Sequence, residues 1–309
     1  MLSSRNYSPS PHLAPFAARH YVFNADLPAD LELADRLLSE TAFIRILLRG
    51  NWDAEVEPGQ WSFPSPILFF GPNSRPLNVR VKGPFTIVGV ALRACGWKGL
   101  FDEPASQLAD RMIPLADLWG DIAIRLLTDI AWLEDDQAIV AAIEDAFTAR
   151  LTRRDCWQID RQMRLFEHIA RNDSTTRVKQ VASMLNLSTR QLERQCLASF
   201  GHSPKTIMRR SRFLDMASVM RGLGDPSEQQ LAELCYFDQS HRTREFRRFI
   251  AMTPNQFART PTPLFDAGLK LRHERKAEVL EDPISLGARL PMPLPHPLSP
   301  SHDHAGSSG

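Results

Sequence analysis

The stretch VKQVASMLNLSTRQLER, residues 178–194, decides the fold of this chain. It opens with an apolar stripe at helical spacing, formed by Val178, Val181, Ala182 and Leu185. Asn186 follows, and asparagine tolerates the left-handed backbone conformation that a tight turn often needs. Residues 188–191 (Ser-Thr-Arg-Gln) have the form of a capping box, in which two side chains satisfy amide groups at a helix start. We therefore expect two short helices joined by a turn.

The second of these helices has one apolar and one polar side. Leu192, Cys196 and Phe200 recur at helical spacing and are expected to face inward. The outward set is then Arg190, Gln191, Glu193 and Arg194. This pattern predicts a helix-turn-helix whose second helix is polar and carries arginines.

The same unit occurs twice, because a shift of 50 residues pairs Arg194 with Arg244 and Ser203-Pro204 with Thr253-Pro254. In the second copy, residues 228–234 are expected to form the first helix and residues 238–250 the second. The outward set of that second helix is Gln239, Ser240, His241, Thr243, Arg244, Arg247 and Arg248. Between the copies, Ser203 to Gly222 is predicted to form one long helix that starts with Pro204. Its polar face is expected to carry Lys205, Arg209, Arg210 and Arg212.

Charge is divided unevenly along the chain. Residues 1–152 carry a net charge of −6 and residues 153–260 one of +8, although the whole chain carries only +1. A basic segment attracts polyanions, so nucleic acid is a candidate partner for the second half. The split also indicates that the two halves have different roles.

The first half shows strand signals followed by helix signals. Apolar runs at residues 42–48, 67–70 and 86–92 predict short strands, with Gly-Pro or Pro-Gly turns between them. From Gly96 to Leu151 the apolar spacing becomes helical. Residues 1–30 hold prolines and small polar residues and are expected to be irregular.

We predict an α+β protein in three parts. Residues 1–152 form a β-rich, small barrel- or sandwich-like domain with helices, and residues 153–262 form an all-α domain with two helix-turn-helix units. Residues 263–309 are expected to be a mostly disordered tail, because proline and small polar residues cannot bury enough apolar surface to offset chain ordering.

Two groups of residues carry a resemblance to a known family. The first contains Val181-Ala182, Ser188, Leu192 and Arg194, followed by residues 201–204 (Gly-His-Ser-Pro). The second contains residues 238–241 (Asp-Gln-Ser-His), 244–246 (Arg-Glu-Phe) and Thr253-Pro254 with Phe257. Together they resemble the DNA-binding domain of AraC/XylS-type bacterial transcription regulators. Three residues depart from the pattern of that family. Cys235 precedes Tyr236-Phe237 where glycine is usual before the aromatic residue, Arg242 follows residues 238–241 where an apolar residue is usual, and Ala251 stands where glycine is usual. Residues 70–120 are similar, more loosely, to β-rich sensor domains that precede some AraC-type domains.

The resemblance implies sequence-specific DNA binding, with two recognition helices in adjacent major-groove segments. The expected base-reading residues are Arg190, Gln191, Glu193, Arg194, Gln239, Ser240, His241 and Arg244. Arginine can read guanine, glutamine adenine, and glutamate cytosine. The expected phosphate contacts, which fix register without reading sequence, are Lys205, Thr206, Arg247 and Arg248.

The resemblance also implies the partners of a transcription regulator. These are double-stranded DNA and RNA polymerase, with a small-molecule effector and a homodimer as further candidates and no cofactor. We expect no membrane contact, because no run approaches the ~20 apolar residues of a spanning helix. A cytoplasmic location is expected, since the start shows no secretory signal and the four cysteines form no C-x-x-C pair.

Aromatic residues in the first half are candidates for a ligand pocket, which would be lined by Trp52, Trp61, Phe69 and Arg93. Arg93 lies inside an apolar strand, where it could meet an anionic ligand or form a structural salt bridge. The aromatic residues could equally belong to the core.

We expect no enzyme and no metal site. No histidine occurs between His20 and His168, so the β region has neither a histidine metal site nor a Ser-His-Asp triad. No glycine-rich nucleotide-binding motif occurs either. Two alternatives stay open: a β-barrel enzyme with an accessory DNA-binding module, and a first domain that only dimerises.

Overall fold

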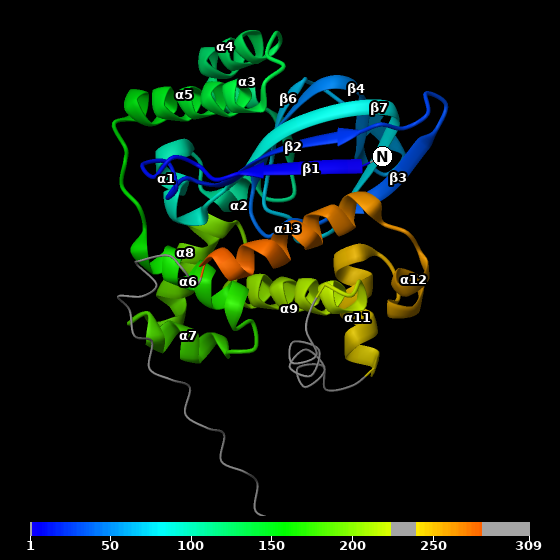
Figure 1. Ribbon diagram of the computed structural model, residues 1–309. Helices are drawn as coiled ribbons and strands as arrows, with labels where there is room; N and C mark the ends of the chain where they lie inside the picture. Colours follow the sequence, from blue (N-terminus) through cyan, green and yellow to red (C-terminus); the bar gives the residue numbers. More distant parts are fainter. Residues whose placement is uncertain (1, 224–238, 280–309) are drawn as a thin grey trace, which may run out of the picture.

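Strands and helices divide the chain into two halves in the computed structural model, which describes residues 2–223 and 239–279 (Figure 1). Strands occur only before residue 115 in this described part, and helices prevail from Ala94 onward. The predicted α+β organisation, with a β-rich first part and a helical second part, is confirmed.

The N-terminal half is built on one eight-stranded sheet with antiparallel pairing. Its strands are β1 (Leu2–Tyr7), β2 (Ala17–Ala25), β3 (Glu32–Leu37), β4 (Phe43–Glu57), β5 (Gln60–Ser62), β6 (Ile67–Phe70), β7 (Leu77–Leu92) and β8 (Met112–Pro114). The order along the sheet is β1-β2-β7-β4-β6-β8, with β3 beside β7 and β5 beside β4. The long strands β4 and β7 therefore connect all the others.

Two glycines let the long strands bend. Gly50 in β4 has a φ of +88° and Gly83 in β7 one of +64°, a backbone region that glycine enters at little cost. A Cβ on Gly50 would lie 2.3 Å from the carbonyl oxygen of Pro84, so a larger residue cannot fit there. Before its bend β7 pairs with β3, and after the bend it pairs with β2. The sheet thus curves around an interior.

Side-chain alternation gives the sheet two apolar faces, because successive residues of a strand point to opposite sides. Ile44 and Val88 face a core shared with helices, whereas Phe43 and Ile87 face the inside of the curved sheet. The helices over the first face are η1 (Ala94–Gly96), α1 (Trp97–Leu100), α2 (Ala105–Leu108), α3 (Leu115–Trp119), α4 (Asp121–Ile130) and α5 (Asp136–Arg154).

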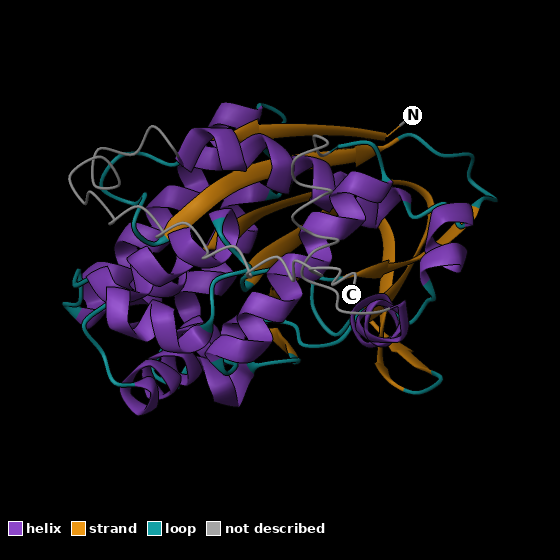
Figure 2. Ribbon diagram, turned by 90° about the horizontal axis from the view of Figure 1, so that it is seen from below, coloured by secondary structure: helices purple, strands orange, loops and turns teal. Residues whose placement is uncertain are grey.

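The C-terminal half is helical and lies along one side of the sheet. Its helices are α6 (Arg161–Asn172), α7 (Val178–Met184), α8 (Thr189–Phe200), α9 (Pro204–Met220), α11 (Gln239–Ile250), α12 (Pro254–Arg259) and α13 (Pro263–Val279). Helices α7 and α8 lie near one end of α9, and α11 and α12 lie near the other (Figure 1). Seen from below, these helices lie in front of the strands (Figure 2).

The first helix-turn-helix forms as its sequence predicts. Val181, Ala182 and Leu185 are buried, and Asn186 has a φ of +54° in the turn. Ser188 and Gln191 form the expected capping box at the start of α8. Helix α9 begins at Pro204 behind an N-cap Ser203. The expected first helix of the second copy, residues 228–234, lies outside the described residues.

The prediction of an irregular start was wrong, because residues 2–7 and 17–25 form strands β1 and β2. Strand β2 is buried along most of its length, so it lacks the alternation of polar and apolar residues that marks a half-exposed strand. The prolines between the two strands further favoured the interpretation of this segment as irregular. Strand β1 pairs with β2 over all six of its residues.

Residues 263–279, which the sequence places in a mostly disordered tail, form helix α13, so the assignment of this segment to the tail was wrong. Phe265 and Leu269 are almost completely buried against α9 and α11. A carboxylate oxygen of Asp35, in β3, accepts hydrogen bonds from the amides of Leu264 (2.7 Å) and Phe265 (3.1 Å). These amides lie in the first turn of α13, so a strand of the other half caps this helix.

The two copies differ at one strained turn. Gly201, after α8, has a φ of +75°, and Ala251, at the equivalent place after α11, has a φ of +54°. The left-handed conformation costs a residue with a Cβ about 1 kcal/mol or more. We predict that Ala251→Gly raises the free energy of unfolding by about 1 kcal/mol, measured by urea denaturation.

The matched control is Gly201→Ala, whose Cβ would lie 3.0 Å from the carbonyl oxygen of Ala105. This variant is expected to lower the stability. Equal or lower stability of Ala251→Gly relative to the parent would show that the turn carries no strain.

Candidate nucleic-acid interface and interior cavity

Helix α8 presents a polar surface at its N-terminal half. Arg190, Glu193 and Arg194 are exposed, while Leu192 and Cys196 on the opposite side are completely buried. Gln191 is exposed too, but its side-chain oxygen accepts a hydrogen bond from the Ser188 amide (2.8 Å). Part of its hydrogen-bonding capacity therefore serves the helix cap, and its NH₂ group is left for other partners.

Helix α11 presents the second set of predicted residues. Gln239, Ser240 and Arg244 are exposed, and His241 is partly buried. On the other side, Phe246 and Phe249 are fully buried against α9 and α13. The burial pattern therefore orients α11 as the sequence predicts.

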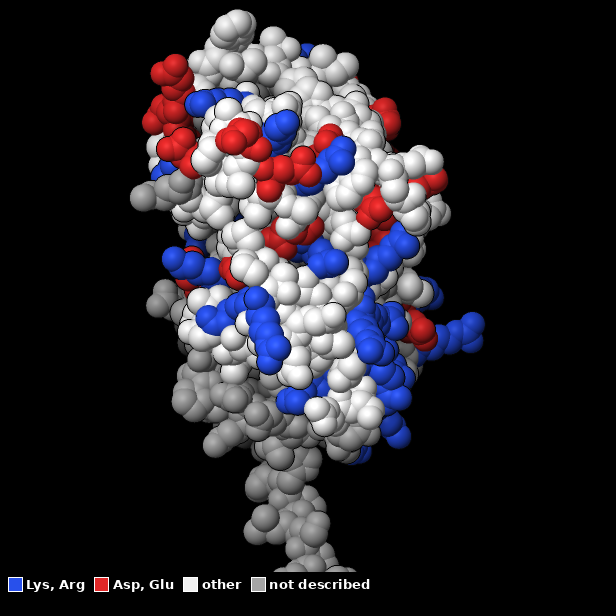
Figure 3. Space-filling model, turned by 90° about the vertical axis from the view of Figure 1, so that its right-hand side faces the viewer, with Lys and Arg blue, Asp and Glu red and all other residues white. Residues whose placement is uncertain are grey.

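The predicted phosphate contacts lie beside these helices. Lys205, Arg247 and Arg248 are exposed, whereas Thr206 is partly buried with its hydroxyl 3.1 Å from the hydroxyl of Ser203. Seen from the α11 side, Lys and Arg gather over the lower, C-terminal half of the molecule and Asp and Glu over the upper half (Figure 3). The charge split along the chain is thus also a split in space.

The predicted polar face of α9 does not point to solvent. Arg210 is 1% exposed, and its guanidinium donates hydrogen bonds to the backbone carbonyls of Asn73 and Glu40. Arg209 forms a two-point ion pair with Glu245 of α11. Arg212 donates to the carbonyl of Ser174 (2.9 Å). Of the four residues expected on this face, Lys205 alone is exposed. The other three contact the N-terminal half, α11 and the loop after α6.

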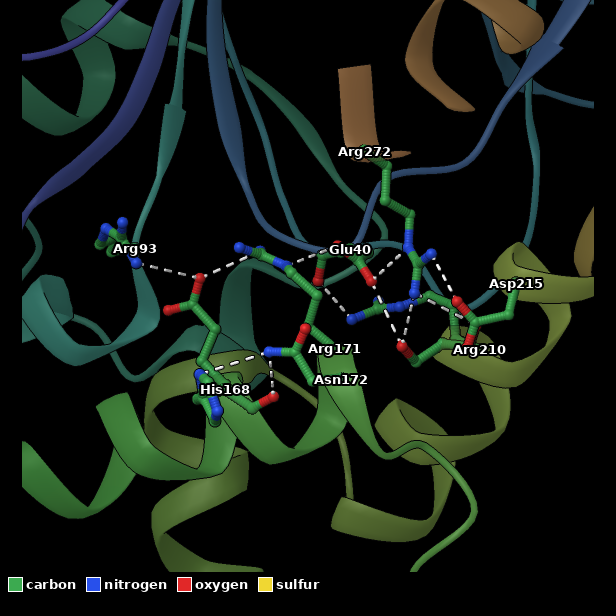
Figure 4. A network of polar contacts seen from close by, with 10 residues as sticks. Glu40, Arg93, His168, Arg171, Asn172, Arg210, Asp215 and Arg272 are labelled. Carbon is green, nitrogen blue, oxygen red and sulfur yellow. Dashed lines mark hydrogen bonds and ion pairs between the residues drawn. The ribbon is translucent and has the colours of Figure 1, made fainter. Parts of the chain in front are cut away.

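One carboxylate from the N-terminal half receives several arginines of the C-terminal half (Figure 4). Glu40, in the loop between β3 and β4, accepts hydrogen bonds from Arg272 of α13 (2.8 Å) and Arg171 of α6 (3.3 Å). Arg272 also donates to Asp215 of α9 (2.6 Å). Together with Arg210 we call these residues the Glu40 cluster.

In the Glu40 cluster, the neighbouring positive charges together affect the pKa of Glu40 more than burial does. Burial alone would raise the pKa of Glu40, but the guanidinium groups of Arg272 and Arg171 hold that pKa well below its usual range. Burial lowers the pKa of Arg210 to about 10, so this residue is still charged at neutral pH. The cluster is therefore ionised and ties three helices of the C-terminal half to one loop of the N-terminal half.

A cavity of about 170 Å³ lies inside the curved sheet, with α13 as one wall. Its lining comes mainly from α13, from residues 37–41 before β4, and from β4 and β2, and it is largely apolar. Trp52, one of the predicted pocket residues, lines it. Arg45 of β4 lines it as well and was not among the predicted residues.

The other predicted pocket residues lie elsewhere. Phe69 is completely buried in the core between sheet and helices, beside Trp97 and Phe101. Trp61 packs under the guanidinium of Arg80, which is 4.5 Å from its ring centre. Arg93 forms an ion pair with Glu167 of α6 (3.6 Å), which is the salt-bridge alternative.

The sequence does contain a signal for Arg45. In the run from Phe43 to Leu47, the arginine occupies the same strand face as Phe43 and Leu47, which belong to the apolar interior. A charged residue in step with an apolar alternation needs a partner or a function.

Within the described ranges, no three His, Cys, Asp or Glu side chains lie close enough together to hold a metal ion. Over the same ranges, no helix combines the length and the apolar character that crossing a membrane requires.

Two regions of the chain match known sequence families. Residues 181–260, from α7 to the end of α12, match a helix-turn-helix domain. Residues 5–114, which contain all the strands after β1 and the second half of β1, match a domain of unknown function, DUF6597. A comparison of the sequence with curated proteins gave no match.

Solved structures of ToxT from Vibrio cholerae are similar in fold. ToxT with a bound unsaturated fatty acid shares 13% identity at a TM-score of 0.44, over 77% of this chain and 94% of ToxT. ToxT bound to (E)-4-(8-methylnaphthalen-1-yl)but-3-enoic acid shares 11% identity at a TM-score of 0.43, over 83% and 98%. The AraC-like transcriptional activator CuxR shares 12% identity at a TM-score of 0.27, over 76% and 90%.

Replacing Glu40 tests the cluster. Glu40→Gln leaves three buried or partly buried guanidinium groups short of a negative charge, and we expect a loss of about 3 kcal/mol in unfolding free energy at pH 7. Because the pKa of Glu40 is lower in the folded than in the unfolded state, its contribution is complete above pH ~5 and declines as the pH falls. The stability difference between parent and variant should therefore shrink from pH 7 to pH 3 in urea denaturation.

Glu57→Gln is the control, since Glu57 lies exposed at the end of β4. An ionised cluster would be contradicted if Glu40→Gln lost no more unfolding free energy than Glu57→Gln, or if its loss did not change with pH.

Proposed function

We propose that this chain, an AraC-type helix-turn-helix regulator with an N-terminal domain of unknown function, regulates transcription by binding a specific DNA site through α8 and α11. In this proposal the two helices enter adjacent major-groove segments, roughly one helical turn apart. The proposal places the protein in the cytoplasm, with the DNA.

The observation that carries the proposal is the arrangement of α8. A capping box fixes where the helix starts, and its buried residues fix which side faces outward. Arg190, Glu193 and Arg194 then lie together on the exposed N-terminal half of the helix. Recognition helices of this type contact base edges with that half.

Helix α11 supports a second contact. Gln239, Ser240 and Arg244 are exposed in its first half, and Arg247 and Arg248 follow in the second. Amide and guanidinium groups can read base edges, while the later arginines suit phosphate oxygens. The basic lower half of the molecule adds long-range attraction to DNA (Figure 3).

Three further partners belong to the proposal. The cavity under α13 is the candidate site for a small-molecule effector, since it is concave, largely apolar and carries a charged group. RNA polymerase and a second copy of the chain follow from the family resemblance alone.

We predict that Arg194→Ala weakens binding to the specific site by about 1–3 kcal/mol and relaxes the preference at one base step. Lys205→Ala is expected to weaken specific and non-specific binding alike, and to reduce the slope of log affinity against log salt by about 0.9. Both effects can be measured by fluorescence anisotropy with a selected site and with variants of that site at several salt concentrations.

Arg125→Ala is the matched control, because this arginine of α4 is 73% exposed and lies outside the proposed interface. An equal loss on every sequence for Arg194→Ala would assign that residue to the phosphate. Unchanged binding by both Arg194→Ala and Lys205→Ala would refute the proposed interface.

A further inference from the structure

The cavity under α13 contains a positive charge that no described acid neutralises. Its charged lining residues are Glu40, Arg45 and Arg272. Glu40 and Arg272 pair with each other in the Glu40 cluster. Arg45 forms no ion pair with any residue in the described ranges. Its Nε donates a hydrogen bond to the hydroxyl of Tyr21 (2.8 Å).

Aromatic rings hold this guanidinium in place. Its central carbon lies 4.5 Å from the ring centre of Phe43, 5.6 Å from that of Trp52 and 5.7 Å from that of Phe70. Cation–π attraction favours such contacts. With Nε bound to Tyr21, the two terminal amino groups are left for another acceptor.

A glycine makes this arrangement possible. A Cβ on Gly89 of β7 would lie 2.5 Å from the hydroxyl oxygen of Tyr21. The absence of a side chain there lets the Tyr21 ring lie over the sheet, where its hydroxyl reaches Arg45. The orientation of Arg45 is thus built into three strands.

We propose that the cavity binds a small aromatic monocarboxylate, with its carboxylate on the terminal amino groups of Arg45 and its ring among Phe43, Trp52 and the apolar side of α13. The guanidinium fork matches a carboxylate in two-point geometry, and such charge-assisted bonds are stronger than neutral ones. A neutral ligand could fill the cavity but would gain no ion pair with this partly buried guanidinium. This assignment rests on the proposed function, because it names the chemistry of the effector.

The volume of the cavity limits the size of the apolar part of the ligand. A dry cavity of about 150 Å³ in another protein takes up benzene, and the cavity here measures about 170 Å³. One ring with a carboxylate therefore fits, whereas a long alkyl chain exceeds this space. Access is provided beside Ser4 and Gly268, the two exposed residues of the lining.

A second consequence follows from the position of α13. Leu269 and Phe265 line the cavity and also belong to the core around α9 and α11. A ligand held against Arg45 would add contacts to α13, so binding is expected to slow hydrogen exchange in that helix.

The test uses the full chain without DNA and benzoate as the probe. We expect benzoate to raise the melting temperature in a dose-dependent way, and to bind with a measurable heat in titration calorimetry. Benzamide, which has the same shape without the charge, and acetate, which lacks the ring, are expected to bind about 10- to 100-fold more weakly. Hydrogen exchange should slow in α13 with benzoate.

Arg45→Met should weaken benzoate binding by the same factor and reduce the preference of the protein for benzoate over benzamide. The melting temperature of this variant without ligand should not fall, because the substitution removes a charge that has no ion-pair partner. Arg80→Met is the matched control: Arg80 also stacks on a tryptophan, but it pairs with Asp53 (3.1 Å) and does not line the cavity. It should leave benzoate binding unchanged. If Arg45→Met does not fold, Arg45→Lys, which keeps the charge without the planar fork, should still bind benzoate more weakly than the parent.

Equal binding of benzoate and benzamide by the parent, no binding of benzoate at millimolar concentration, or tighter binding of dodecanoate than of benzoate would each overturn the assignment. None of these results depends on DNA binding. A failure of the DNA-binding proposal would therefore appear in the anisotropy measurements and leave the ligand measurements intact.

Discussion

The structure depends on one partly buried carboxylate, that of Glu40, and on the buried arginines that surround it. Arg171 of α6, Arg210 of α9 and Arg272 of α13 all reach the loop that carries Glu40, through its side chain or its backbone carbonyl. An isolated buried charge is expensive, but opposite charges with complete hydrogen bonding offset that cost. These contacts fix the position of the helical half on the β-rich half. The basic surface with α8 and α11 is thereby held in one orientation relative to the sheet.

Helix α13 connects the three features that matter for function. Its first turn is capped by Asp35 of β3, its middle closes the cavity, and Arg272 joins the Glu40 cluster. Phe265 and Leu269 at the same time complete the core on which α11 packs. The wall of the cavity and α11 therefore share the packing of one helix. In physical terms, effector binding and DNA binding would be coupled through the packing of this helix.

Local patterns in the sequence were sufficient to predict the first helix-turn-helix. Ser188 with Gln191, and Asn186 before them, specify the helix-turn-helix through contacts within a few residues, so the structure agrees with the prediction there. The failures concern long-range packing. Periodicity shows that Arg210 lies on the polar side of α9, but it cannot show that Glu40, 170 positions earlier, covers that side. Likewise, β2 is buried on both faces, and α13 is stabilised by its contacts with Asp35 and α9. Both depend on residues far away in the sequence, which local patterns do not show. Arg45 interrupts an apolar strand, and Arg93 directly follows one. Tertiary structure alone shows that Glu167 neutralises Arg93 and that Arg45 lies in a cavity.

The central claim is that α8 and α11 read two major-groove segments from one face of the DNA. Dimethyl sulfate protection of guanine N7 atoms, which lie in the major groove, measures this directly on a selected binding site. We predict two protected segments whose centres are about 10 base pairs apart, with the guanines facing Arg194 released in the Arg194→Ala complex. A single protected segment, or two segments half a turn out of phase and thus on opposite faces of the duplex, would contradict it.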